Sequence, residues 1–154
     1  MSPNHRRRGF SLIELLIVIA IILIIITVAV PKFQKAQMFA RNMGALKAIQ
    51  TIHQMEVQYQ SQYGRYANSL AELGPPASGA ASPAAADLID GTLAGGVKAG
   101  YKYTITGGNG GYVVTAVPET FGTSGSRTFF SDQTMVIHVN DGPEVATASS
   151  PEAK

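Results

Sequence analysis

The sequence predicts an α+β protein in which one long N-terminal helix, transmembrane and then amphipathic, packs on a small antiparallel sheet of about four strands. The first sign is an uncharged stretch, Leu15 to Val30, with Thr27 as its single polar residue. The second is a change of hydrophobic spacing after Lys98, from every three or four residues to every two.

Charge is distributed unevenly along the chain. The chain has 12 basic and 10 acidic residues, and removing Arg6, Arg7 and Arg8 leaves 9 basic residues. Residues 31–65 then carry five bases and one acid, whereas residues 66–154 carry four bases and eight acids. A basic helix and an acidic C-terminal part favour packing between subunits, and no specific nucleic-acid ligand is expected.

The apolar segment is long enough to cross a bilayer. Extended back to Phe10, it reaches 21 residues, and at ~1.5 Å per residue a helix of that length spans ~30 Å. A secretory signal cleaved at Thr27-Val28-Ala29 is one interpretation, but Glu14 interrupts its apolar region and Pro31 follows the cut. A plain signal anchor is another, and it explains the hydrophobicity alone.

The run Arg6-Arg7-Arg8-Gly9-Phe10-Ser11-Leu12-Ile13-Glu14-Leu15 supports a third interpretation. It resembles the prepilin motif of type IV pilins and type II secretion pseudopilins. The resemblance implies a pilin fold, cleavage between Gly9 and Phe10 by a prepilin peptidase, N-methylation of Phe10, and retention of the apolar helix. We favour it because it accounts for the basic leader, the glycine and the acid together.

The resemblance also assigns assembly roles to Phe10, Glu14 and Pro31. A carboxylate at the edge of an apolar span is costly and points to function, and the family match implies that Glu14 pairs with the Phe10 amine of a neighbouring subunit. The alternative is a Glu14 side chain that extends to the interface. Pro31 lies where these helices commonly carry proline, and it is expected to kink or locally melt the helix.

An amphipathic helix is expected to continue from residue 32 and to end near Gly64. Its apolar face is predicted from residues three and four apart, and His53 and Glu56 are read as a solvated i, i+3 pair. Asn42 is expected on the polar face. The predicted apolar residues are Phe33, Ala36, Phe39, Met43, Leu46, Ile49 and Ile52.

Residues 64–73 are read as a turn and a short helix capped by Ser69, and they resemble the stretch after the long helix in major pseudopilins and related pilins. Residues 75–86 contain only Pro, Ala, Ser and Gly and predict a poorly ordered surface loop. Alternation predicts strands at residues 101–106, 112–117, 127–131 and 135–140. Residues 145–154 are expected to form a flexible tail.

This pattern divides the chain into four parts. A cytoplasmic leader occupies residues 1–9 and the transmembrane, assembly helix residues 10–31. The head covers residues 32–144, with a variable loop at 75–97 and the sheet at 98–140, and the tail covers 145–154.

The chain departs from the family pattern in two ways, one that concerns a disulfide and one that concerns a metal site. The chain has no cysteine, so it cannot form the C-terminal disulfide of many major pilins. It also lacks a recognisable form of the calcium loop usual in major pseudopilins. No cofactor or metal is expected, with Asp132 and Asp141 as the alternative ligands.

The resemblance implies a structural protein, not an enzyme. The first hypothesis is a type IV pilus subunit serving adhesion, motility or DNA uptake, and the alternative is a major (G-type) pseudopilin of a type II secretion system. A membrane-anchored periplasmic binding domain that never polymerises is a third. The implied partners are copies of the chain, the prepilin peptidase, membrane lipid, and an inner-membrane assembly platform with its secretin. The implied location is the inner membrane, with a cytoplasmic N-terminus and periplasmic head, and afterwards a surface filament.

Overall fold

The computed structural model describes residues 9–153, and the chain divides into two compact units, residues 1–36 and 37–154. Helix α1, Leu12–Tyr63, contributes to both units. It ends where expected, because Gly64 adopts a left-handed φ of 73° that favours glycine and closes the last turn by donating its N–H to Gln60.

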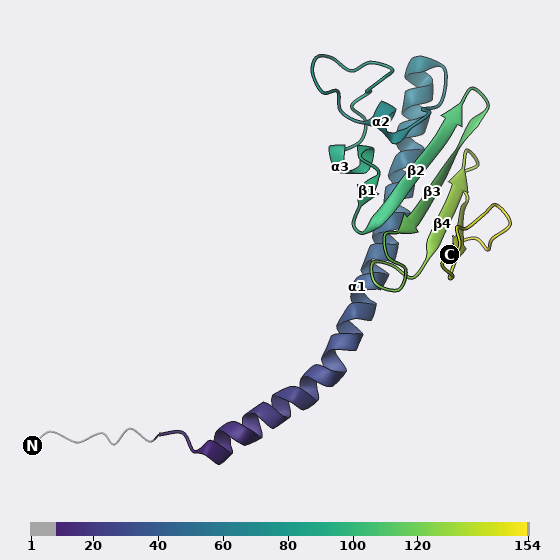
Figure 1. The fold of residues 1–154 in the computed structure, drawn as a ribbon. Coiled ribbons are helices and arrows are strands. Elements are labelled where there is room, and N and C mark those ends of the chain that lie inside the picture. Colours follow the sequence, from purple (N-terminus) through teal and green to yellow (C-terminus); the bar gives the residue numbers. More distant parts are fainter. Residues whose placement is uncertain (1–8, 154) are drawn as a thin grey trace, which may run out of the picture. The chain divides into compact units, whose positions relative to one another are not determined.

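The second unit contains a five-stranded antiparallel sheet in the order β1-β2-β3-β4-β5 (Figure 1). The strands are β1 Val97–Lys98, β2 Tyr101–Gly108, β3 Gly111–Pro118, β4 Thr128–Asp132 and β5 Ile137–Asn140. The predicted α+β class and four main strands are confirmed, and the two-residue β1 adds a fifth. Strand β1 is too short to give an alternating pattern in the sequence.

The two main hairpins form where the turn residues predict them. Asn109 and Gly110 connect β2 to β3, whose register runs from Tyr101 opposite Pro118 to Gly108 opposite Gly111. The β4–β5 turn is held by Asp132, whose carboxylate accepts a hydrogen bond from the Thr134 N–H at 2.9 Å. Such an Asx turn satisfies the backbone locally and fixes the hairpin.

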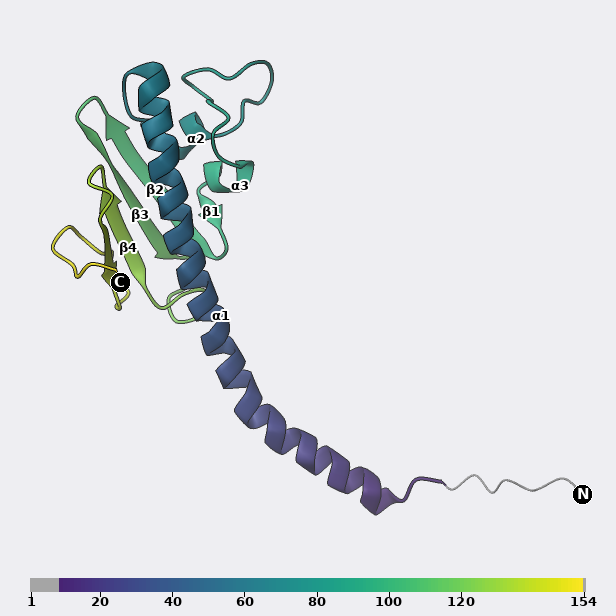
Figure 2. The same cartoon turned by 180° about the vertical axis from the view of Figure 1, so that it is seen from behind.

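The C-terminal part of α1 lies along one face of the sheet (Figure 2). Ile49, Ile52 and Tyr59 on the helix are completely buried, as are Tyr101 and Phe129 on the sheet. Alternate residues of β2 and β3 enter this core because successive side chains of a strand point to opposite faces.

The helix face that meets the sheet differs from the predicted one. Ile49 and Ile52 are buried as expected, but Phe39 is 62% exposed and the predicted polar residue Asn42 is buried. The buried positions repeat at spacings of three and four, but they include polar as well as apolar residues. A prediction from hydrophobicity alone therefore selects a face that is rotated around the helix axis relative to the buried one. The buried positions are Asn42, Ala45, Ala48, Ile49, Ile52, His53, Glu56 and Tyr59.

Two short helices follow α1, namely α2 Leu70–Leu73 and α3 Gly91–Ala94. Ser69 occupies the predicted N-cap of α2, but its side chain makes no capping hydrogen bond. The Glu72 carboxylate instead accepts from the Asn68 N–H at 3.0 Å, as in the returning half of a capping box. Helix α3 was not anticipated, although Asp90 caps it through the N–H groups of Thr92 and Leu93.

The Pro, Ala, Ser and Gly loop is attached to the core near its end. The Tyr59 hydroxyl donates to the Pro83 carbonyl at 2.6 Å, and the buried Ala86 donates its N–H to the Glu72 carbonyl at 2.8 Å. The loop therefore begins as surface chain and ends as part of the packed unit, which its composition does not indicate.

The C-terminal segment differs from the flexible tail that its sequence predicts. The Val139 N–H donates to the Pro151 carbonyl at 2.8 Å, and the Ala153 N–H donates to the Ile137 carbonyl at 2.7 Å. Ala146 is buried, and its N–H donates to the Thr128 hydroxyl. Residues 151–153 thus cover the outer edge of β5, where unpaired backbone groups would otherwise be open.

Burial on α1 predicts a contrast between two aliphatic residues on this helix. Ile52→Ala should lower the free energy of unfolding by about 2–5 kcal/mol, because it opens a cavity in the core. Val57→Ala should change it by less than about 0.5 kcal/mol, since Val57 is 44% exposed. Denaturant unfolding of the full chain in detergent, followed by circular dichroism, measures both, and equal effects would contradict this packing of α1.

Candidate assembly site

The predicted cleavage junction lies in an extended segment before α1. Gly9, Phe10 and Ser11 are not helical, and the Leu15 N–H makes an early bond of the helix to the Ser11 carbonyl at 3.2 Å. Gly9 is exposed and no atom lies within 4 Å of the position a Cβ would take. A protease can bind such a backbone without unwinding a helix. Arg6, Arg7 and Arg8 lie outside the described residues.

Glu14 lies in the first turn of α1, close along the chain to Phe10, and the first buried residue of that helix, Asn42, follows 28 positions later. Ser11 precedes the helix and Glu14 is its third residue, the Ser-x-x-Glu spacing of a capping box. A carboxylate here is favoured by the partial positive charge of the helix N-terminus. The sequence analysis did not identify this local role, although the spacing is visible in the sequence.

The apolar residues that follow are all exposed in this unit. Helix α1 is the one helix in the described residues that is long and apolar enough to cross a membrane, with a mean hydropathy of 3.3 over its most apolar window and none of that window buried. Thr27 fits an apolar environment because its hydroxyl donates to the Ile24 carbonyl at 2.7 Å. This surface is consistent with insertion in a membrane.

Pro31 lies inside α1, and the helix runs through it without interruption. The local melting anticipated for this position therefore does not occur in the structure. Proline removes one backbone donor, so the carbonyl four residues earlier, at Thr27, has no helical N–H to bind.

The two candidate metal ligands are not brought together. Asp132 ends β4, whereas Asp141 follows β5, and the antiparallel register places them at opposite ends of that hairpin. The Asp132 carboxylate binds Thr134, and Asp141 forms an ion pair with Arg127 at 2.7 Å. Residues 9–153 contain no group of three or more His, Cys, Asp or Glu side chains placed to hold a metal ion.

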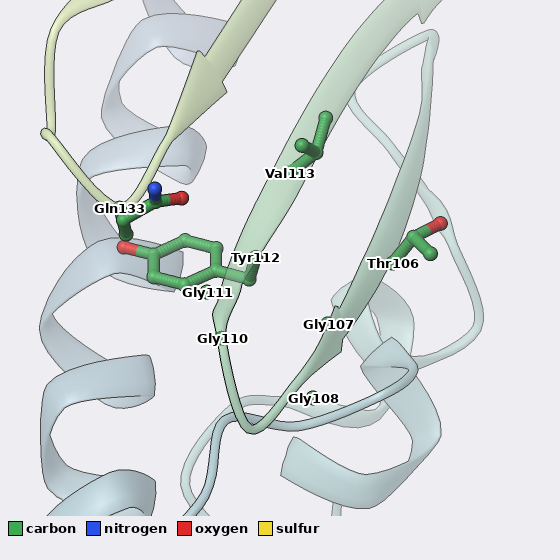
Figure 3. Close-up of a pocket in the computed structure, with 8 residues that line it drawn as sticks. All are labelled: Thr106, Gly107, Gly108, Gly110, Gly111, Tyr112, Val113 and Gln133. Carbon is green, nitrogen blue, oxygen red and sulfur yellow. The ribbon is translucent and has the colours of Figure 1, made fainter.

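A hollow of about 360 Å³ lies at the β2–β3 hairpin (Figure 3). Glycines 107, 108, 110 and 111 form most of it, with Tyr112 and Gln133 beside them. No side chain of its lining is charged, so it offers no acid, base or cation for catalysis. Tyr112 reaches from β3 toward α1 in this view, where it binds His53.

His53, expected to be solvated, is buried in a directed chain of hydrogen bonds. The Ser131 hydroxyl donates to the Val136 carbonyl at 2.7 Å, so its oxygen accepts from the His53 Nε2–H at 2.8 Å. His53 Nδ1 is then the acceptor for the Tyr112 hydroxyl at 2.5 Å. This chain requires a neutral imidazole, and burial lowers the pKa of His53 while Asp132 partly offsets that effect.

Asn42 forms a second polar link between α1 and the sheet. Its Oδ1 accepts from the Tyr101 hydroxyl at 2.7 Å and from the Ser126 N–H at 3.2 Å, and its Nδ2 donates to the Ser126 hydroxyl at 3.0 Å. Together, Asn42 and His53 fix the register of the helix on the sheet more narrowly than apolar contacts alone.

Glu56, also expected to be solvated, is completely buried. Its Oε2 accepts from the Ala67 N–H at 2.9 Å, while Oε1 has no hydrogen-bond partner. Burial raises the pKa of Glu56 to about 7, the Ala67 N–H opposes the shift, and Glu72 adds to it. The hydrogen bond from Ala67 connects the end of α1 to the following turn, but burial disfavours the charged form of the Glu56 carboxyl.

Two comparisons bear on these features. The prokaryotic N-terminal methylation motif matches residues 4–30. The type IV major pilin protein PilA of Myxococcus xanthus (strain DK1622) is 37% identical over 71 residues. That match covers 46% of this chain and 32% of the Myxococcus protein, about a third of its length.

The buried carboxyl predicts a pH-dependent difference between the native chain and Glu56→Gln. The raised pKa of folded Glu56 gives stability that is complete below about pH 4.5 and is lost as the pH rises through about 7, by up to about 1.4 kcal/mol per pH unit. The free energy of unfolding of Glu56→Gln should therefore rise relative to that of the native chain as the pH increases across this range.

His53 acts in the opposite direction, because its lowered pKa costs stability as the pH falls below its ordinary value near 6.5. Both chains contain His53, so its contribution cancels when their free energies of unfolding are compared at each pH from 4 to 8. A constant difference between the chains would show that Glu56 does not titrate with folding.

Proposed function

The methylation motif and the pilin relative support the type IV pilin family, and from that premise we propose that the chain is a structural subunit of a type IV pilus. It polymerises through its N-terminal helix after prepilin processing. The observation that carries this proposal is an exposed apolar helix with a carboxylate, Glu14, in its first turn, directly behind a glycine junction.

Processing creates one half of the assembly site. A prepilin peptidase cuts between Gly9 and Phe10 and methylates the new amine of Phe10. The exposed, non-helical backbone at Gly9 and the helix start at Leu12 support this step, because the bond is accessible and α1 remains whole after it is cut. Methylation keeps the positive charge of the amine.

Before assembly, the subunit spans the inner membrane once. The leader with its three arginines stays in the cytoplasm and the head lies in the periplasm, as the basic residues before the apolar segment favour. The inner-membrane platform and the secretin are the further partners of this proposal, and the filament then extends from the cell surface.

Assembly transfers the apolar helix from lipid to a bundle of other such helices. In that bundle the Glu14 carboxylate pairs with the Phe10 amine of a neighbouring subunit, which offsets the desolvation of both charges. Because only one axial position of the neighbour brings the two charges together, the pair sets the register of the filament. Pro31 removes one helical hydrogen bond where the apolar segment ends.

A major pseudopilin of a type II secretion system is the alternative, since both kinds of subunit share this assembly. The Myxococcus relative is a type IV major pilin, which favours a pilin, and Asp132 and Asp141 do not form the acidic loop usual in major pseudopilins. Deleting the gene distinguishes the two. Loss of surface filaments, with adhesion, motility or DNA uptake, supports the pilin, and a block in protein export supports the pseudopilin.

The processing step predicts the mass of the mature chain. Intact-mass measurement should find a chain that begins at Phe10 and carries one additional methyl group. A mature chain that begins at Val30 would identify a cleaved secretory signal, and an uncut Arg8-Gly9 junction would identify a simple anchor. Either result would contradict the proposal.

The charge pair predicts a specific assembly defect. Glu14→Leu should insert in the membrane and be processed normally, because the cut depends on Gly9, but filament yield should fall strongly. An unpaired buried amine costs about 3–5 kcal/mol at every subunit. The measurement is the yield of sheared filaments relative to the processed pool in the membrane.

Glu14→Asp is the matched control, since it keeps the charge on a shorter side chain and should retain more filament than Glu14→Leu. Thr27→Val controls for changes within the apolar segment and should assemble normally, because the Thr27 hydroxyl bonds only its own helix. Normal filament yield from Glu14→Leu would refute the pairing.

A further inference from the structure

A groove runs beside α1 at the β4–β5 turn, and we call it the Met135 groove. It consists of two adjoining hollows of about 450 and 400 Å³ that share Gln50 and Met135. Val57 lines the first, and Leu46, Val136 and Glu152 line the second. The groove lies between α1 on one side and the β4–β5 turn with the C-terminal segment on the other.

The turn presents an apolar side chain to this groove at a conformational cost. Met135 adopts a left-handed φ of 64°, which is strained for a residue with a side chain. The turn holds Met135 in this conformation. The Met135 N–H donates to the Asp132 carbonyl, and the Asp132 carboxylate accepts from the Thr134 N–H. Met135 is 49% exposed and Val57 is 44% exposed. Met135 lies where the two hollows meet, and a flexible thioether at such an exposed position is suited to contact a partner.

The same chain carries exposed aromatic side chains next to bases, and Lys35 lies one turn before Phe39 on the same helix face. Phe33 and Phe39 are 65% and 62% exposed, and Lys32 and Lys35 lie between or beside them. No acid occurs between Leu15 and Met55. The groove has acids at its edge, Glu152 in its lining and Asp132 in the adjacent turn, whose pKa is lowered by Thr134 so that it stays charged.

Lys47 is the one base of α1 near the groove within the described residues, one turn before Gln50. Within residues 9–153, two acids and one lysine of α1 therefore lie at this edge. An aromatic, basic segment complements the exposed apolar side chains of the groove and the acids at its edge.

We propose that the Met135 groove binds the Lys32–Phe39 segment of a second copy of this chain. The interface is heterologous, because groove and segment are different surfaces. Such an interface continues from copy to copy and does not close after two. The inference rests on the proposed filament function and adds a contact of the head to the helix contact made through Glu14.

Disulfide trapping between two copies tests the contact, since the native chain has no cysteine. One chain carries Phe39→Cys and the other Val136→Cys, with different tags, and both are expressed together as full-length chains. Val136 lies in the groove beside Met135 and has no left-handed backbone to disturb. Mild oxidation should give a disulfide-linked heterodimer several-fold above a control pair, Phe39→Cys with Ser78→Cys in the exposed loop.

A charge exchange makes the test specific. Lys35→Glu in the Phe39→Cys chain should reduce trapping several-fold, and Glu152→Lys in the Val136→Cys chain should restore it. Trapping no higher than that of the Ser78→Cys control would overturn the groove contact. Filament yield from the same cells separates the two claims, because filaments without trapping refute the groove alone, whereas processed chains that form no filaments refute the proposed function.

Discussion

The apolar surface of α1 between Leu12 and Val30 is the constraint on which the rest of this protein depends. All of its large hydrophobic side chains are exposed in the structure, and each square ångström of apolar surface left in water costs about 25 cal/mol. A second environment must therefore cover it. In the proposed function, lipid covers it before assembly and other copies of the helix cover it afterwards. Glu14 is the one charged residue between Leu12 and Val30.

The C-terminal part of the same helix must also be held firmly on the sheet. Apolar packing through Ile49 and Ile52 provides affinity, but it allows neighbouring registers. Asn42 and His53 exclude those registers, because a shift of the helix would separate Asn42 from its partners at Tyr101 and Ser126 and would take His53 away from the Tyr112 hydroxyl. The polar groups in this core thus hold the C-terminal part of α1 on the sheet at one defined position.

Much of the fold was predictable because its signals are local. The long helix follows from its apolar run and its spacing up to Tyr63, and the main strands follow from alternation and from turn residues such as Asn109-Gly110. The buried side of α1 was not predictable in the same way. Asn42 and Glu56 are polar in any hydrophobicity count, and only their distant partners on the sheet and at Ala67 explain their burial. Strand β1 pairs locally with β2 but is too short to show alternation, whereas the pairing of residues 151–153 with β5 depends on contacts 12 or more residues apart. At the candidate assembly site, the sequence pointed to Gly9, Phe10 and Glu14, but the proposed pairing of Glu14 with Phe10 joins two chains and so lies outside the fold of one copy.

The central claim is that Glu14 of one subunit neutralises the Phe10 amine of the next. Filaments assembled from two separately labelled pools of subunit, one with ¹⁵N-phenylalanine and one with ¹³C-carboxyl glutamate, test it most directly by solid-state NMR. The account predicts magnetisation transfer between the Phe10 amine nitrogen and the Glu14 carboxyl carbon, since the two atoms lie within about 4 Å as in other ion pairs. Filaments that form normally without this intersubunit transfer would contradict it.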